Sequence, residues 1–249
     1  MYKTEYDIAL RAAIEAGKYL EENYCAEVDS QNGKDIKLAS DKKSESIIID
    51  ILKETDIPIL SEEYGMVEGA NNSKVWIVDP LDGTANYWKG MKELACVSVA
   101  LWENGQPILG VINRFHQGEI YSGIVGKGAW LNGEAITTSS VESVQSAILA
   151  TGFPVNRDYT DESLGNFIKQ IQRFKKVRML GAAAIMGAFV SGGRVDAYVE
   201  EQIMWWDIAA SSAIVKAAGG AIDIQMLDNN QCICNLFANE KLYCDYKKM

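Results

Sequence analysis

Apolar side chains recur along this chain with two different spacings. Near the N-terminus they recur every three or four positions, as at Tyr6, Leu10 and Leu20, which predicts an amphipathic helix. Further along the chain, short β-prone apolar runs end abruptly at turn residues, which predicts strands. The expected helices cover residues 4–24, 40–52, 162–174, 181–191 and 205–218. The expected strands cover residues 57–60, 75–78, 94–101, 107–115, 146–150, 195–200, 221–224, 232–238 and 241–246, with further strands within 119–136.

Turn signals indicate how the strands are connected. An Asn-Gly pair at 104–105 separates the strands at 94–101 and 107–115, and a second pair lies at 132–133. Asn-Gly is a strong signal for a two-residue hairpin turn, so this part of the chain predicts an antiparallel meander. The polar stretch 27–39 predicts a loop or an irregular hairpin. Helical pairs that alternate with antiparallel and mixed sheets indicate an α+β fold.

Composition narrows the class of protein. The chain has 249 residues, 48% hydrophobic and 23% charged, which is typical of a globular protein with a sizeable core. We expect a single domain over residues 1–249, with an N-terminal half of about 1–140 and a C-terminal half of about 141–249. The net charge of −10 disfavours binding to nucleic acid polymers and to anionic membrane surfaces. Neither a signal peptide nor an apolar run of about 20 residues is present, so we expect a cytoplasmic protein.

The cysteines and the single histidine exclude several kinds of site. Five scattered cysteines do not form the pattern of a disulfide framework. Cys232 and Cys234 are spaced to hold a soft metal, but no second pair is present and His116 is the sole histidine. We therefore expect buried or free thiols, and neither a histidine zinc centre nor a Ser-His-Asp triad.

The largest group of candidate functional residues follows the apolar run at 75–78. Asp79 and Asp82 lie three positions apart with a proline between them, at the end of the expected strand. Two carboxylates that face one point repel each other unless a cation lies between them. Oxygen ligands favour Mg²⁺, Mn²⁺ or Ca²⁺ over zinc, and the N–H groups of Gly83 and Thr84 could hold a phosphate. The alternative interpretation is an Asp-rich turn that caps a helix.

Three ordered motifs carry a resemblance to a known family. Residues 79–84, Asp-Pro-Leu-Asp-Gly-Thr, resemble the first signature of the inositol monophosphatase family of lithium-sensitive, Mg²⁺-dependent phosphomonoesterases. Glu62-Glu63 resembles the upstream acidic pair of that family, and residues 206–210 resemble its second signature. The resemblance spans roughly residues 9–223. It implies a layered αβαβα sandwich, inhibition by lithium and a homodimer.

The resemblance also implies a set of metal ligands. One Mg²⁺ would be held by Glu62, Asp79 and the carbonyl of Leu81, and a second by Asp79, Asp82 and Asp207. A weaker third ion would bind near Glu62, giving two or three ions per subunit. Taken alone, Asp207 is also the expected N-terminal cap of a helix, and capping is compatible with metal binding.

Catalytic and substrate-binding roles follow by the same resemblance. Thr84 and Asp41, together with Glu62, would orient the attacking water. Asp41 also has an interpretation as a first-turn acid favoured by the helix dipole. Glu200 has two interpretations. It is either a surface acid or a contact to a substrate hydroxyl, because the family has such a contact at the same distance in sequence before the second signature. The expected substrate-binding residues are Asp82, Gly83, Thr84, Ala183, Glu200 and Asp207.

The resemblance predicts the hydrolysis of a small phosphate monoester to an alcohol and inorganic phosphate, without a covalent intermediate. Compact length and the spacing of Glu200 favour inositol-1-phosphate. The alternatives are a 3′(2′),5′-bisphosphate nucleotidase, a histidinol-phosphate or fructose-1,6-bisphosphate phosphatase, or a non-catalytic regulator that binds a phosphorylated metabolite. Three departures from the family bear on the substrate. Leu38 replaces the usual threonine, Ala182 stands where Ser or Thr is common, and Trp205 could alter the substrate rim.

Overall fold

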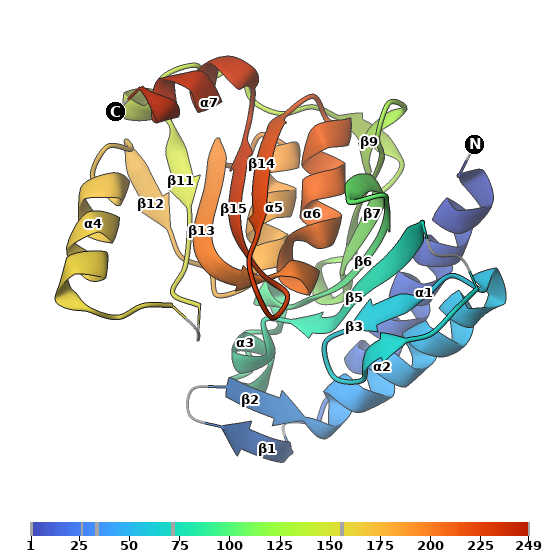
Figure 1. The fold of residues 1–249 in the computed structure, drawn as a ribbon. Coiled ribbons are helices and arrows are strands. Elements are labelled where there is room, and N and C mark those ends of the chain that lie inside the picture. The colour runs from blue at the N-terminus through green and yellow to red at the C-terminus, as the bar shows by residue number, and fades with distance from the viewer. Residues whose placement is uncertain (1, 26, 33–34, 71–72, 155–156, 249) are drawn as a thin grey trace.

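Layers of helix and sheet alternate through the molecule, as the computed structural model in Figure 1 shows. A pair of N-terminal helices covers one face of an eight-stranded sheet, and a second helix pair lies between that sheet and a five-stranded sheet. Further helices cover the outer side of the five-stranded sheet. The order confirms the α+β layered αβαβα sandwich. The structure describes residues 2–25, 27–32, 35–70, 73–154 and 157–248.

Helices supply three of these layers. The outer pair is α1 (Lys3–Glu22) and α2 (Ala39–Leu52), and the central pair is α5 (Ala183–Ser191) and α6 (Trp205–Ala217). The remaining α-helices are α3 (Thr84–Trp88), α4 (Asp161–Ile171) and α7 (Glu240–Lys247). Short 3₁₀ turns cover Lys53–Thr55, Lys92–Leu94, Phe115–Gln117 and Val144–Ser146.

The two sheets come from different parts of the chain. The larger has the order β10-β9-β8-β7-β6-β5-β3-β4 and is antiparallel except between β3 and β5. Its strands are β3 (Ile59–Ser61), β4 (Gly65–Val67), β5 (Lys74–Asp82), β6 (Cys96–Glu103), β7 (Gln106–Arg114), β8 (Glu119–Ile124), β9 (Gly128–Leu131) and β10 (Glu134–Ile136). The smaller has the order β12-β11-β13-β15-β14, in which β11 is parallel to both neighbours. Its strands are β11 (Ile148–Ala150), β12 (Lys176–Arg178), β13 (Ala197–Met204), β14 (Ala221–Met226) and β15 (Gln231–Phe237).

Strand β5 is buried on both faces, as its apolar run predicts. Trp76 and Val78 join the hydrophobic cluster under α1 and α2, whereas Ile77 joins the cluster that faces α5 and α6. This alternation follows from the two-residue period of a strand. The expected hairpin between β6 and β7 also forms, and both Asn104 and Gly105 have positive φ, as a two-residue turn requires.

A small two-stranded sheet fills the polar stretch before α2. β1 (Val28–Asn32) and β2 (Asp35–Leu38) pair antiparallel, with an irregular register, which confirms the irregular hairpin. This hairpin lies beside α3 at one end of the molecule (Figure 1).

Residues 241–246 and the end of β5 differ from the sequence expectation. Residues 241–246 form helix α7 rather than a strand, because Leu242, Tyr243 and Tyr246 pack inward at helical spacing and Asn239 caps the helix. Strand β5 continues through Pro80 to Asp82, where its pairing with β6 becomes irregular, so the proline does not end the strand.

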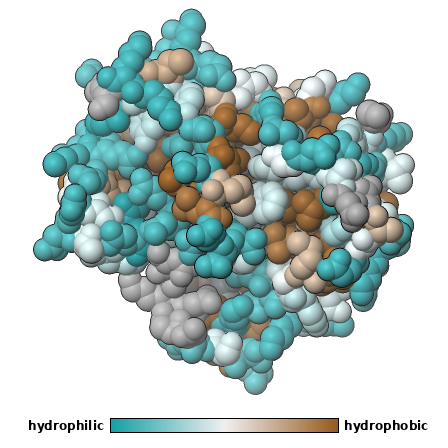
Figure 2. All heavy atoms as spheres, in the orientation of Figure 1, coloured by the Kyte–Doolittle hydropathy of each residue, from teal (hydrophilic) through white to brown (hydrophobic). Residues whose placement is uncertain are grey.

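Figure 2 shows one face of the molecule, which is mostly polar with separate hydrophobic patches. No helix in the described ranges is long and apolar enough to cross a membrane.

Candidate active site

A cavity of about 820 Å³ lies where β5, β13 and the starts of α5 and α6 meet. All four predicted metal-ligand carboxylates line it, although they come from three separate parts of the chain: the turn between β3 and β4, strand β5 and helix α6. The lining also includes the other predicted substrate-binding positions and the predicted carbonyl ligand. Together these residues are Glu62, Asp79, Leu81, Asp82, Gly83, Thr84, Ala183, Glu200 and Asp207.

The end of β5 and the turn that follows it are fixed by local hydrogen bonds. The N–H of Leu81 donates to Asp79 Oδ1 at 3.0 Å, and the Thr84 hydroxyl donates to the Leu81 carbonyl at 2.9 Å. Gly83 has a φ of 85° and precedes the first residue of α3. A side chain at Gly83 would place its Cβ 2.5 Å from the carbonyl oxygen of Leu94. The turn therefore requires glycine for both backbone conformation and space.

Asp82 connects this turn to the central helix layer. Its carboxylate accepts the N–H groups of Ala183 at 3.2 Å and Ala184 at 2.8 Å, in the first turn of α5. The Cys96 thiol donates to Asp82 Oδ2 at 3.6 Å. Asp82 thus caps a helix that lies about a hundred residues further along the chain, and the N–H of Ala183 is engaged by this carboxylate.

Asp207 and Asp41 occupy the same position in two different helices. Asp207 lies in the first turn of α6, where the backbone N–H of Met204 donates to its carboxylate. Asp41 lies in the first turn of α2, and its Oδ2 accepts the N–H of Leu38 at 2.7 Å. Asp207 lines the cavity, whereas Asp41 is buried at 4% exposure and is not among the lining residues. The catalytic role of Asp41 therefore stays a prediction from resemblance.

Burial shifts the protonation of the cavity acids. Burial raises the pKa values of Asp79 and Asp207 well above the ordinary range, and repulsion from Glu62 and other acids adds to the shift. Burial also raises the pKa of Asp82 to about 6, although the N–H groups of α5 oppose the rise. Without a counter-charge, this group of carboxylates resists full ionisation.

Glu200 belongs to the cavity wall. It is only 5% exposed, so its interpretation as a surface acid is wrong. Burial raises the pKa of Glu200 to about 7, and the hydroxyl of Tyr198, which donates to Glu200 Oε2 at 2.8 Å, acts in the opposite direction. Strand β13 continues past Glu200 to Met204, so this acid does not end the strand as expected.

The donor set fits a hard divalent cation. The four predicted ligand side chains offer only carboxylate oxygens, and burial keeps the neighbouring Cys96 thiol neutral by raising its pKa. Within the described residues, no three His, Cys, Asp or Glu side chains are already arranged to hold one ion. The cavity therefore provides suitable oxygens that a bound cation would draw together.

Cys232 and Cys234 pack within a hydrophobic cluster. Cys232 and Cys234 are buried and free, as expected. Burial raises the pKa of Cys232 to about 12 and that of Cys234 well above its usual range.

Glu45 is a buried acid that sequence reasoning missed. Its Oε1 accepts the hydroxyl of Ser61 and the N–H groups of Glu63 at 3.0 Å and Tyr64 at 3.1 Å. These three donors lie in the turn that carries Glu62. The sequence did contain a signal, because position 45 lies on the apolar stripe of α2 together with positions 48, 49 and 52.

The three departures from the family occupy different environments. Leu38 is fully buried in the core under α1 and α2. Ala182 precedes α5 without a side-chain cap, and the carboxylate of Asp82 accepts the N–H groups instead. Trp205 packs edge to face against Trp102 at 5.3 Å, and Trp206 lines the cavity in its place.

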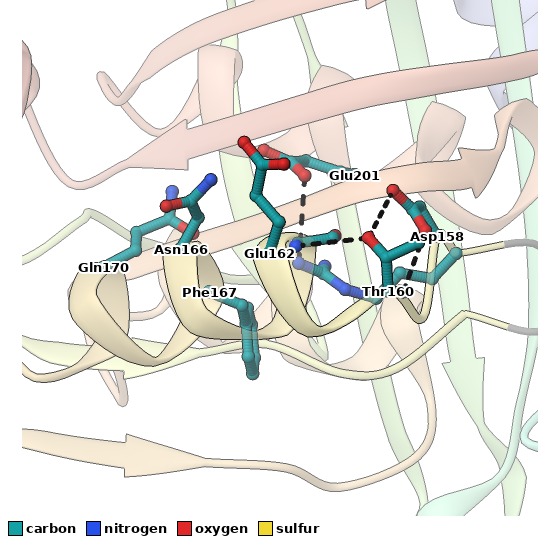
Figure 3. Close-up of a pocket in the computed structure, with 9 residues that line it drawn as sticks. Asp158, Thr160, Glu162, Asn166, Phe167, Gln170 and Glu201 are labelled. Carbon is teal, nitrogen blue, oxygen red and sulfur yellow. Dashed lines mark hydrogen bonds and ion pairs between the residues drawn. The ribbon is translucent and has the colours of Figure 1, made fainter.

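A second cavity of about 420 Å³ lies between α4 and β13 (Figure 3). The side chain of Arg157, 3% exposed, stacks on Phe167 at 4.4 Å and lies 3.8 Å from Glu201. Asp158 and Glu162 also line it, so negative charge exceeds positive charge. None of the predicted ligand acids lines this cavity, and we place the candidate chemistry in the larger one.

The layered fold and its acid-lined cavity define the class of protein that the motifs indicate. The model of the inositol monophosphatase family matches residues 1–232, and the chain belongs to this family of phosphatases.

Named relatives support this membership. The chain is 33% identical over 223 residues to the Nus factor SuhB of Escherichia coli (strain K12), covering 87% of this chain and 83% of the relative. It is 37% identical over 199 residues to a fructose-1,6-bisphosphatase/inositol-1-monophosphatase of Thermotoga maritima, covering 78% and 74%. An inositol monophosphatase structure from Anabaena superposes with a TM-score of 0.85 at 30% identity over 98% of this chain and 94% of that one.

Proposed function

We propose that this protein hydrolyses a small phosphate monoester to an alcohol and inorganic phosphate, using Mg²⁺. The observation that carries this proposal is the meeting of Glu62, Asp79, Asp82 and Asp207 in one cavity. A cavity that is rich in acids would repel an anionic substrate unless divalent cations reversed the local charge. Membership of a phosphatase family supports the same conclusion.

The cations would be held by residues from several elements. Glu62, Asp79 and the Leu81 carbonyl would hold one Mg²⁺, and Asp79, Asp82 and Asp207 a second, with a weaker third near Glu62. When bound, Mg²⁺ would supply Lewis-acid stabilisation of the phosphate charge and of the attacking water. The family resemblance supports this assignment, as does the donor set of the cavity.

The chain's own groups would position the reactants. The Thr84 hydroxyl donates its hydrogen bond to the Leu81 carbonyl, so the hydroxyl oxygen is left to accept a hydrogen bond from water. Glu62 would accept a proton from that water, and the N–H groups of Gly83 and Thr84 would donate to the phosphate. Glu200 would accept a hydrogen bond from a substrate hydroxyl.

We favour inositol-1-phosphate as the substrate. A buried acid on the cavity wall suits a ligand that carries many hydroxyl groups, because each hydroxyl can donate to a carboxylate oxygen. The Anabaena relative is named an inositol monophosphatase, and the Thermotoga relative is named for both fructose-1,6-bisphosphate and inositol-1-phosphate.

A nucleotide bisphosphate is the second candidate. Phe153 and Tyr159 both line the cavity, are exposed, and stack with ring centroids 6.3 Å apart. Exposed stacked rings at a cavity wall suit a planar base.

Phosphate release from a panel of substrates tests the proposal. The panel contains inositol-1-phosphate, fructose-1,6-bisphosphate, histidinol phosphate and adenosine 3′,5′-bisphosphate, each with and without Mg²⁺. We expect Mg²⁺-dependent release that Asp79→Asn reduces by at least about a hundredfold, with the exposed acid Asp50→Asn as the matched control. Unchanged activity in Asp79→Asn refutes the mechanism. Tight binding without release in the parent protein supports a non-catalytic regulator instead.

A further inference from the structure

One basic side chain lies within the acid cavity. Among the described residues that line it, Lys37 is the only lysine or arginine, against the five acids Glu62, Asp79, Asp82, Glu200 and Asp207. Its Nζ lies 2.7 Å from Glu63 Oε1, and the side chains are 31% and 7% exposed respectively. The ammonium group is therefore partly shielded from water and placed next to the Glu62-Glu63 pair.

The local fold determines where Lys37 points. On β2, Ile36 packs against the core and Leu38 is buried in it, and the Leu38 N–H donates to Asp41. These contacts fix the strand at the start of α2. The ion pair with Glu63 then joins the β1–β2 hairpin to the turn between β3 and β4. Lys37 is thus held by two separate parts of the fold, and its charge is not a freely solvated one.

A fixed ammonium group has opposite effects on the two kinds of ligand that the proposed function requires. It attracts a phosphate and repels a divalent cation that approaches Glu62. The paired Glu63 carboxylate opposes both effects, but unlike Lys37 it is not among the described residues that line the cavity. Because the pair is partly buried, salt screens these effects less than it screens an exposed lysine.

We propose that Lys37 is an anion-binding and specificity-determining residue of this cavity, which strengthens phosphate binding and limits the occupancy of the weakest cation position beside Glu62. The inference rests on the proposed function for its ligands, inorganic phosphate or a phosphate monoester together with Mg²⁺. Lys37 takes no part in bond breaking. Its contribution is to the binding of phosphate and to the number of cations that the site holds.

Three variants of the 249-residue chain test this role. Lys37→Met removes the charge and keeps the length of the side chain, and Lys37→Arg keeps the charge. Lys42→Met is the matched control, because Lys42 lies on the adjacent helix and pairs with Asp29 of the same hairpin at 2.6 Å, outside the cavity lining. Circular dichroism and thermal unfolding check that each variant folds.

Calorimetry supplies two readouts that do not depend on turnover. The first is Mg²⁺ binding to the protein alone, and the second is binding of inorganic phosphate at saturating Mg²⁺. For Lys37→Met we expect phosphate affinity to fall by about tenfold while the weakest Mg²⁺ affinity rises by about threefold or more. Lys37→Arg and Lys42→Met should resemble the parent in both.

The direction of the two shifts decides the outcome. A fall in both affinities assigns Lys37 a structural role in the hairpin and overturns the proposal, as does no change in either. Opposite shifts in a protein that releases phosphate from no substrate leave the Lys37 assignment standing and refute the catalytic function. If the parent protein hydrolyses a substrate but Lys37→Met loses both phosphate affinity and Mg²⁺ affinity, the role of Lys37 is refuted and the catalytic function stands.

Discussion

Replacement of Gly83 by alanine tests the physical basis of the turn that carries Asp82 and Thr84. Gly83 has a φ of 85°, where a residue with a side chain costs about 1–2 kcal/mol. The Cβ atom of an alanine at position 83 would also lie 2.5 Å from the Leu94 carbonyl oxygen, and Cβ atoms in proteins essentially never approach another atom closer than 3.0 Å. The backbone of the turn or of Leu94 would therefore have to move.

The expected cost has two parts that a control can separate. The conformational cost and the displacement of the backbone together should destabilise the protein by about 3 kcal/mol. For a chain of this size, that corresponds to a fall in melting temperature of about 6–12 °C. Gly90→Ala is the matched control, because Gly90 has a φ of 81° but its Cβ would meet nothing within 4 Å. The control should lose only the conformational part, about 1–2 kcal/mol.

Thermal unfolding by circular dichroism measures both variants, and phosphate release at saturating Mg²⁺ measures the site. We expect Gly83→Ala to lose activity by at least about tenfold, because it moves Asp82 and Thr84 relative to each other. The control should retain the activity of the parent. Equal losses of melting temperature in the two variants would refute the argument from close approach to Leu94.

Two further predictions follow from buried acids. Tyr198→Phe removes the hydroxyl that donates to Glu200, so the pKa of Glu200 should rise above its present value of about 7. A higher pKa means that the Glu200 carboxylate is already protonated at a higher pH than in the parent. The kcat/KM of the variant for inositol-1-phosphate, relative to the parent, should therefore fall more at pH 6.5 than at pH 8.5. An equal fall at the two pH values would contradict this. Glu45→Ala leaves three donors in the turn around Glu62 without their acceptor, so chemical denaturation should show a loss of about 2–4 kcal/mol. A loss below about 0.5 kcal/mol would show that the donors find other partners.

Local sequence predicted the parts of the site that depend on short-range signals. Asp82 at the end of β5 and Asp207 in the first turn of α6 followed from pattern alone, whereas Asp79 lies inside β5, because the strand continues past Pro80. The convergence of these acids with Glu62 followed from the family resemblance, since periodicity does not place distant elements beside one another. The Asn-Gly turns were predictable because positive φ selects those residues.

Other features depend on contacts that no local pattern encodes. Asp82 caps α5 from another layer, and Lys37 meets Glu63 through the packing of a hairpin against a turn. Glu45 carried a signal, an acid on an apolar stripe, but its partners belong to a different element. The final helix was mistaken for a strand because its short apolar run of residues 241–246 fits both periods, and the Asn239 cap decides between them.

In the proposed function, carboxylates from distant segments form one site for hard divalent cations. A crystal soaked in Mn²⁺ and measured at the manganese absorption edge tests this most directly. We predict one anomalous peak among the oxygens of Asp79, Asp82 and Asp207, and a neighbouring peak beside Glu62 and the Leu81 carbonyl. Carboxylates that remain apart with no peak between them would contradict it.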